Sequence, residues 1–529
     1  MKPNIISNPD QKPLIRAGLA FCTLLLTTIA LWLLTFSLGN TELMFLNDPL
    51  TWLRQLESDA AFDTLGNAAE VVAAVLAIAI TVVAIIVELA ANRYSHLITR
   101  LFVHEPVNMA VLGLFVITTI QCVWTAATLT DSQTADLLPQ AGFAITMALV
   151  TLSLLALLPY IYFVFTFLSP ISIIHRICQN AFKVIQRARA HNVETSQRKA
   201  KDAIDELQDV SRSAIQQGDR GIAMSGVSAL TGLIYDYANI RESLPANWFR
   251  VSETVAHDPD FVALAEDSLR AIEEQKIWLE TKIFRQLFSL MSQSAGQARD
   301  VANLIGINTQ EIARDLGAQN KPLLKLCMRA FNSYLRTTIN ARDVRSAYYL
   351  MNQYRILAEH LLEEGQSEAV FEIVGYFRDY GQIAHRLGLS FLLEAASHDV
   401  VQLIERAVAI DSDVVDELID VLLELDQEIK EENQEDSLLG VRRSQIQLAT
   451  LFLLLEQPGR ARRIAEDLRQ ERIERLERLR EALETDDRPE YWELMDRGAN
   501  FSYLAPERRP HLATLFGWLR DSDAANVSD

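Results

Sequence analysis

The sequence contains little cysteine, and its cysteines are isolated from one another. Cys22, Cys122, Cys178 and Cys327 are the four in 529 residues, and none belongs to a C-x-x-C pair. The nine histidines are scattered and include no H-E-x-x-H motif. Disulfide frameworks are typical of short, cysteine-rich chains, and zinc sites use closely spaced Cys and His ligands, so the sequence predicts neither, and we expect no metal and no cofactor.

The chain also lacks the short motifs of common catalytic chemistry. It has no Walker A loop, no G-x-S-x-G turn and no protein-kinase motif. The dipeptide His398-Asp399 has no second metal-binding cluster in the sequence, and we interpret it as an ordinary helix start. We therefore expect no catalytic residue and predict that the protein is not an enzyme.

Basic residues do not balance the acidic ones in the last two thirds of the chain. Residues 1–191 hold ten Lys or Arg and eleven Asp or Glu, which leaves 39 basic and 58 acidic residues in 192–529, a net charge of −19. The helix-turn-helix-like stretch Thr309–Gly317 lies in this acidic part, whereas phosphate binding needs clustered Lys and Arg. We expect no nucleic-acid partner. An apolar, nearly neutral part followed by a charged part indicates a membrane region joined to a water-soluble one.

Four apolar stretches are long enough to cross a bilayer, whose core of about 30 Å needs roughly 20 apolar residues in a helix. They are Ala17–Leu38, Ala68–Ala91, Met109–Leu129 and Ala141–Leu168. The first follows basic residues as a signal peptide does, but it exceeds the length of a signal segment and no A-x-A site follows it. The sequence predicts a four-span transmembrane domain over residues 1–169.

The charges of the loops alternate from one predicted crossing to the next. The loop 39–67 has one basic and five acidic residues, whereas the loop 92–108 carries Arg93 and Arg100. Because cytosolic loops are enriched in Lys and Arg, both termini are expected in the cytosol. The predicted location is a bacterial inner (plasma) membrane, crossed several times, with the lipid bilayer as a partner.

Residues 170–191 form a predicted basic connector helix. Its apolar positions recur at helical spacing, and its basic residues lie on other faces. The basic residues are Arg176, Lys183, Arg187 and Arg189. The pattern favours an amphipathic helix at the membrane surface. A plain extension of the fourth span into the soluble domain is the alternative, and the pattern leaves both open.

The second predicted span carries an acidic stripe. Glu70 and Glu88 are 18 residues apart, which is five turns and about 27 Å of helix, so both carboxylates lie on one side. Thr81 and Asn92 fall on the same side, together with several alanines. The stripe predicts a pore-lining helix whose acidic rings attract cations in an oligomer. The alternative is helix-end electrostatics at Glu70 and headgroup contact at Glu88.

The segment that opens the third span resembles a known family. Asn108, Val111, Leu112, Gly113 and Phe115 fit an N-x-x-V-L-G-x-F pattern position by position. This is similar to a bacterial family of predicted membrane proteins catalogued as domain of unknown function 2254. The resemblance covers about residues 14–190, and it implies a membrane topology without implying an activity.

Residues 192–529 have few Gly and Pro and long runs with apolar residues at three- and four-residue spacing. This predicts an acidic, all-helical cytosolic domain, a bundle or α-solenoid that is tetratricopeptide-like at best. Breaks are expected at uneven intervals. They fall at Gly365, Gly381, Asp411, Pro458-Gly459 and Asp486–Pro489.

Two functions are compatible with these features of the sequence. The acidic stripe favours a homo-oligomeric cation channel or transporter that the helical domain gates. The size of the helical domain favours a membrane-anchored scaffold or sensor, whose solenoid binds a cytosolic protein partner.

Overall fold

The computed structural model describes residues 22–23, 25–31, 58–93, 99, 102–103, 105–130, 137–188, 192–426, 438–491, 497–498 and 500–526. Over these ranges the secondary structure is helical and contains no strand, so the predicted all-helical class is confirmed. The chain divides into two compact units, residues 1–180 and residues 181–529. Each unit is described below by itself.

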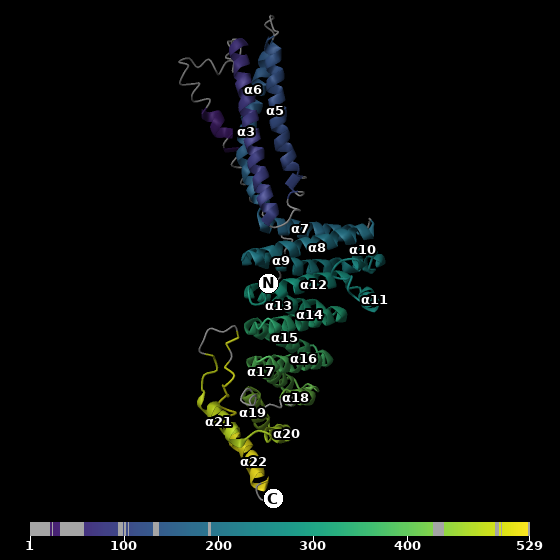
Figure 1. Ribbon diagram of the computed structural model, residues 1–529, viewed down its shortest axis with the longest axis vertical. Coiled ribbons are helices and arrows are strands. Elements are labelled where there is room, and N and C mark those ends of the chain that lie inside the picture. Colours follow the sequence, from purple (N-terminus) through teal and green to yellow (C-terminus); the bar gives the residue numbers. More distant parts are fainter. Residues whose placement is uncertain are drawn as a thin grey trace. The chain divides into compact units, whose positions relative to one another are not determined.

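Three long apolar helices form most of the first unit (Figure 1). They are α3 (Ser58–Arg93), α5 (Pro106–Thr130) and α6 (Leu137–Phe167). Each contains a stretch that is long and apolar enough to cross a membrane. These stretches are Ala60–Asn92, Pro106–Thr128 and Ala141–Phe167, and they match the second, third and fourth predicted spans. The first predicted span lies largely outside the described residues, although 22–23 and 25–31 are helical.

The three helices of the first unit pack around small clusters of apolar side chains. Val72, Phe115, Cys122 and Val150 form one such cluster and bring α3, α5 and α6 together. Large apolar side chains elsewhere point outward, as Ile78, Trp124 and Phe165 do, each at least 60% exposed. An apolar exterior is what a bilayer would cover, because lipid tails solvate such side chains.

A single helix crosses the boundary between the units, and the second unit follows it as a series of helices. The bounds are α7 (Pro170–Arg187), α8 (Val193–Gln216), α9 (Arg220–Ile240), α10 (Glu253–Ala256), α11 (Glu266–Glu274), α12 (Trp278–Ser294), α13 (Arg299–Ile312), α14 (Lys321–Asn340), α15 (Val344–Glu363), α16 (Ser367–Arg386), α17 (Ser390–Ala409), α18 (Val415–Glu424), α19 (Leu439–Leu454), α20 (Pro458–Leu468), α21 (Ile473–Thr485) and α22 (Pro510–Asn526).

The helices of the second unit stack in two layers (Figure 1). One layer runs α8, α12, α14, α16, α18, and the other runs α9, α13, α15, α17, α19, with each helix packed on its neighbours within its layer. Helices that follow one another from α12 to α18 also pack across the two layers. The core therefore lies between the layers and is built mainly from neighbours along the chain.

The turns of the central helices recur at a fixed spacing. Arg342, Gly365, Gly388 and Asp411 all have positive φ angles, and each lies 23 residues after the one before. At each of these turns the residue directly after the one with positive φ donates its backbone N–H back into the last turn of the preceding helix, as Gln366 does to Leu361 O over 2.9 Å. The expectation of uneven breaks is wrong here, since Gly381 lies inside α16.

Three buried glutamines donate hydrogen bonds from their side-chain amides to backbone carbonyls at the end of a helix or between helices. Gln197 donates to the carbonyls of Trp248 and Arg250, both at 2.8 Å. Gln382 donates to the carbonyls of Glu424 and Leu425 at 3.0 and 3.4 Å. The third, Gln447, donates to the carbonyls of Phe501 and Tyr503 at 3.0 and 2.9 Å. Each amide supplies donors to backbone oxygens that have no helix or sheet partner there.

Candidate functional site

The predicted stripe lies on one uncovered side of α3. Glu70, Thr81, Glu88 and Asn92 are all exposed. The buried residues of the helix, among them Val72 and Val87, lie on the side that packs within the unit. The structure thus separates an exposed polar stripe from a packed apolar side on the same helix.

Small side chains surround the middle of the stripe. Ala73 and Ala77 are exposed on α3 and line a shallow apolar groove that continues onto α5 at Val116 and Thr119. The Thr81 hydroxyl donates to the carbonyl of Ala77 over 2.8 Å, so its donor is used within the helix and its oxygen lone pairs remain available. Chemically, this side of α3 offers two carboxylates about 27 Å apart along the helix, with Thr81 and small apolar side chains between them.

The residues of the N-x-x-V-L-G-x-F pattern have structural roles. Asn108 is 3% exposed, and its side-chain amide donates to the carbonyl of Phe102, which closes the turn before α5. Phe115 is 1% exposed in the cluster that joins the three helices. Gly113 is half-buried with open space where a side chain would begin. The pattern therefore fixes the entry and the packing of α5.

Of the four basic residues predicted at the membrane surface, Arg176 is held by other residues of its own unit. Its guanidinium lies 3.6 Å from Glu105 and 3.8 Å from the centre of the Phe167 ring. That ring in turn meets Phe102 edge-on at 5.5 Å. A cation over an aromatic face with a nearby carboxylate is a stabilising arrangement. It ties the start of α7 to the end of α6 and to the segment before α5.

The other basic residues of the connector differ from Arg176. Lys183 and Arg187 are exposed on α7, and Arg189 lies outside the described residues. The apolar positions Ile174, Ile177 and Ile185 of the same helix are buried. The two-sided character predicted for the connector is thus present over the described part of the helix.

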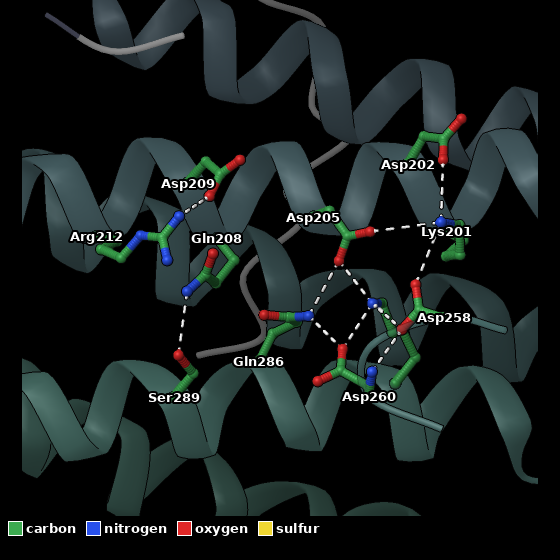
Figure 2. A network of polar contacts seen from close by, with 11 residues as sticks. Lys201, Asp202, Asp205, Gln208, Asp209, Arg212, Asp258, Asp260, Gln286 and Ser289 are labelled. Carbon is green, nitrogen blue, oxygen red and sulfur yellow. Dashed lines mark hydrogen bonds and ion pairs between the residues drawn. The ribbon is translucent and has the colours of Figure 1, made fainter. Parts of the chain in front are cut away.

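Sequence reasoning missed a buried ionic network in the second unit. The Lys282 ammonium, 1% exposed, lies 2.6, 2.8 and 2.6 Å from Asp205, Asp258 and Asp260. Lys201 approaches Asp258 from the other side at 3.2 Å. Figure 2 shows the three carboxylates converging from α8 and from the turn after α10, with Lys201 on the flank.

The hydrogen bonds and ion pairs of this network favour the charged forms of Lys282 and Asp258. Burial lowers the pKa of the Lys282 ammonium, but hydrogen bonds to the three aspartates outweigh this and raise it above its ordinary value. Burial likewise raises the pKa of Asp258, yet the bonds from Lys282 and from the backbone of Asp260 hold it below the usual range. One sequence signal pointed to the network. Lys282 falls one turn after Trp278 and one before Gln286, on the buried side of α12.

The pair His398-Asp399 is not a helix start, because both residues lie in the middle of α17. Asp399 is fully buried and accepts two hydrogen bonds from the Arg497 guanidinium. Burial lowers the pKa of His398 to about 4, so its ring is neutral near pH 7. His398 also lines a cavity of about 250 Å³ with Gln402, Glu405 and Arg508. The sequence alone could not reveal this, because Arg497 lies 98 residues from Asp399.

Comparison with known proteins gives a family match in the N-terminal region of the chain. No curated protein and no solved structure matches the chain. The resemblance carried by Asn108, Gly113 and Phe115 is confirmed, and the match extends past the first unit into α9. Residues 15–224, the N-terminal region of the chain, match the model of the family described as "Predicted membrane protein (DUF2254)".

Proposed function

We propose that this protein is an oligomeric membrane protein whose α3 helices line a path for cations. The observation that supports the proposal is the exposure of Glu70, Thr81, Glu88 and Asn92 on one side of a helix able to cross a membrane. Several copies arranged around an axis would turn these residues toward a common interior.

The energetic argument concerns what surrounds the carboxylates. An ionised side chain facing hydrocarbon is costly, and such residues ordinarily face a polar interior. Glu70 and Glu88, about 27 Å apart, stand close to the two ends of a core about 30 Å thick. At these positions rings of carboxylates would concentrate cations at both mouths, and Ala73 and Ala77 would leave room between them.

The test of this proposal measures cation flux across the membranes of liposomes that contain the purified full chain. Glu70→Gln and Glu88→Gln should lower flux, and the loss should shrink at high salt because salt screens surface charge. Glu242→Gln, an exposed acid of the second unit, is the charge-matched control and should leave flux unchanged.

Steric block of the path gives an independent measurement. Ala77→Trp should abolish flux by size, whereas Val82→Trp should not. Val82 is also exposed, but it lies about 140° around the helix from Ala77. Absence of flux in the wild-type protein, or equal loss in both tryptophan variants, would contradict the proposal.

The proposed setting is a bacterial inner membrane, crossed four times, with both termini in the cytosol. The alternation of charge between the loops supports this orientation. Reporter domains fused after Asn40 and Ser132 should be read outside, and fusions after Glu105 and at the C-terminus inside. A cytosolic signal from either of the first two would overturn the arrangement.

The second candidate is a membrane-anchored scaffold. Its support is the stacking of the second unit, where helices pack mainly on neighbours along the chain, as in an α-solenoid. Such a stack leaves long lateral surfaces for a protein partner. A chain that conducts nothing but retains a protein partner through the second unit would favour this function, and neither candidate requires catalysis.

A further inference from the structure

A non-helical stretch near the C-terminus lies against helices from much earlier in the chain. We name it the return segment, residues 497–498 and 500–508, between α21 and α22. It contacts α15, α17 and α19 through side chains that are 54 to 153 residues away in sequence. It is a segment of turns and irregular backbone that lies across several helices.

The first anchor of the return segment is Arg497. Its guanidinium makes two hydrogen bonds to Asp399 and lies 4.5 Å from the ring centre of Tyr348. The Arg497 side chain is 4% exposed and that of Asp399 is 0% exposed. A planar guanidinium suits this position because it bonds a carboxylate with two parallel N–H groups while stacking on a ring.

The second anchor is Phe501, four residues later. Its ring stacks on Phe391 at 6.1 Å and lies 4.3 Å from the His398 ring. At this anchor and two residues after it, the Gln447 amide donates to the carbonyls of Phe501 and Tyr503. One side chain thereby recognises the backbone of the segment while the rings recognise its sequence.

A third anchor ends the segment. Arg508 bonds Glu405 of α17 over 2.6 Å, beside the cavity that His398 lines. Glu405 and Asp399 are both acidic and lie on the same helix, less than two turns apart. The surface beneath the segment thus presents two carboxylates, an aromatic patch and one amide clamp.

We propose that this surface, the α17 groove, is a recognition site for a non-helical peptide that carries an arginine and, four residues later, an aromatic residue. The groove comprises Tyr348, Phe391, Asp399, Glu405 and Gln447. The chain's own return segment is its internal occupant, and a partner segment of the same chemistry binds by displacing it. The occupant seated in the groove defines which side chains fit.

Two features make the occupant exchangeable for a segment like itself. Its described backbone is joined to the stack by the two bonds from Gln447, whereas most of its other backbone bonds are local turns, such as Tyr503 N–H to Asn500 O. When Arg497 leaves, the cation that stays beside Asp399 among the described residues is Arg355, which is more distant at 3.5 Å. A buried carboxylate that loses its close partner is costly, so the groove selects an incoming arginine.

The test uses the full chain in nanodiscs and a fluorescent synthetic peptide of residues 497–508, with anisotropy as the readout. Arg497→Ala combined with Phe501→Ala in the chain empties the groove. The peptide should bind this variant at least about tenfold more tightly than wild type, where the occupant competes. Glu507→Ala, an exposed position of the return segment, is the matched control and should behave as wild type.

Changing the sequence of the peptide distinguishes specific recognition from non-specific binding. A peptide in which alanine replaces the same Arg and Phe should not bind, and Asp399→Asn added to the emptied chain should abolish binding. Equal binding of both peptides, or no binding to an emptied chain with wild-type circular dichroism, would refute the proposal.

Hydrogen exchange on the wild-type chain tests the proposal without the emptied variant, and it therefore applies even if that variant does not fold. Amides of residues 500–508 should exchange faster than those of α15 and α17, because the segment must leave while the stack stays folded. Protection equal to that of the two helices would overturn the proposal by itself.

Discussion

The two units differ in the buried polar groups that join their helices. Among the described residues of the first unit, buried contacts between helices include two pairs of hydroxyls, Thr118 with Ser153 at 2.8 Å and Thr125 with Thr146 at 3.0 Å. The second unit has a hydroxyl pair of this kind, Ser397 with Ser444 at 3.0 Å. It adds buried contacts that carry full charges, as Lys282 does among its aspartates and Arg497 does on Asp399.

This difference follows from the surroundings that each unit is built for. A bilayer offers no water to a charge that loses its partner, and hydroxyl pairs between membrane helices are worth only about 0.6 kcal/mol on average. A helical stack can hold buried ions if every charge is paired, but removing one member then exposes the full desolvation cost of the other. The second unit should therefore be far more sensitive to single substitutions of buried polar residues.

The largest effect is expected for Lys282→Met. It leaves three aspartates around an apolar side chain, and losing one partner of a buried ion network typically costs about 3–5 kcal/mol of unfolding free energy. Urea unfolding of the full chain in detergent, followed by circular dichroism, measures the loss. The control is Lys201→Met, because Lys201 is 17% exposed and Asp258 keeps Lys282 in that variant. Equal losses in the two variants would break the comparison.

A smaller effect, with a defined pH dependence, is expected at Glu280. Burial raises the pKa of this carboxyl from 4.5 to about 7, although Arg241 at 3.7 Å opposes the shift. The folded chain then binds the proton more tightly than the unfolded chain. The stability linked to this group is complete below the unfolded pKa and is lost as the pH rises through about 7.

Glu280→Gln should therefore be more stable than wild type at pH 8, by up to about 3 kcal/mol, and the gain should vanish near pH 4. Urea midpoints of both proteins across this range give the difference. The exposed Glu242→Gln should follow the wild-type curve throughout. Parallel curves for wild type and Glu280→Gln would show that the buried acid does not hold its proton.

The smallest effect is expected in the first unit, for Thr118→Val. It removes the hydroxyl bond to Ser153 at a cost of about 0.6 kcal/mol. Unfolding in mixed detergent and sodium dodecyl sulfate micelles measures this difference. Thr119→Val is the matched control, since the Thr119 hydroxyl bonds the carbonyl of Phe115 in its own helix. A loss as large as that of Lys282→Met would erase the distinction between the units.

Local patterns were enough to predict the three long apolar helices of the first unit and to place Glu70 and Glu88 on one side of α3. Length and hydropathy define a span without any knowledge of its partners, and the 18 residues between Glu70 and Glu88 place both on one side of any helix. The exposure of the stripe was consistent with that placement. Each of these inferences uses residues of a single helix.

Two glycines show where local reasoning failed in the second unit. Gly388 has a φ of +76° and ends α16, whereas Gly381 is helical and lies where α17 passes closely. A side chain at Gly381 would meet Leu393 and Ala396 at 3.0 and 3.2 Å. The sequence analysis predicted a break at Gly381 and none at Gly388, and only the packing of α16 on α17 distinguishes a turn from a close approach.

The ionic networks could not be predicted because their members are far apart in the chain. Asp258 lies 24 residues before Lys282. Asp205 lies 81 residues before Gln286, whose side-chain amide donates a hydrogen bond to it. Each is an ordinary charged residue within its own helix or turn. Their meeting depends on how α8, α12 and the turn after α10 stack, which no spacing rule in the sequence expresses.

The even spacing of the central turns gives the second unit a rule for insertions and deletions. Two successive 23-residue steps return the chain to the same layer and the same direction, because each step reverses a helix. Losing residues 366–411 would join Gly365 to Ser412 and replace one positive-φ turn by an equivalent one. Losing a single step would send every later helix the opposite way. Within this stretch, lineages of the protein should differ in length by whole helix pairs.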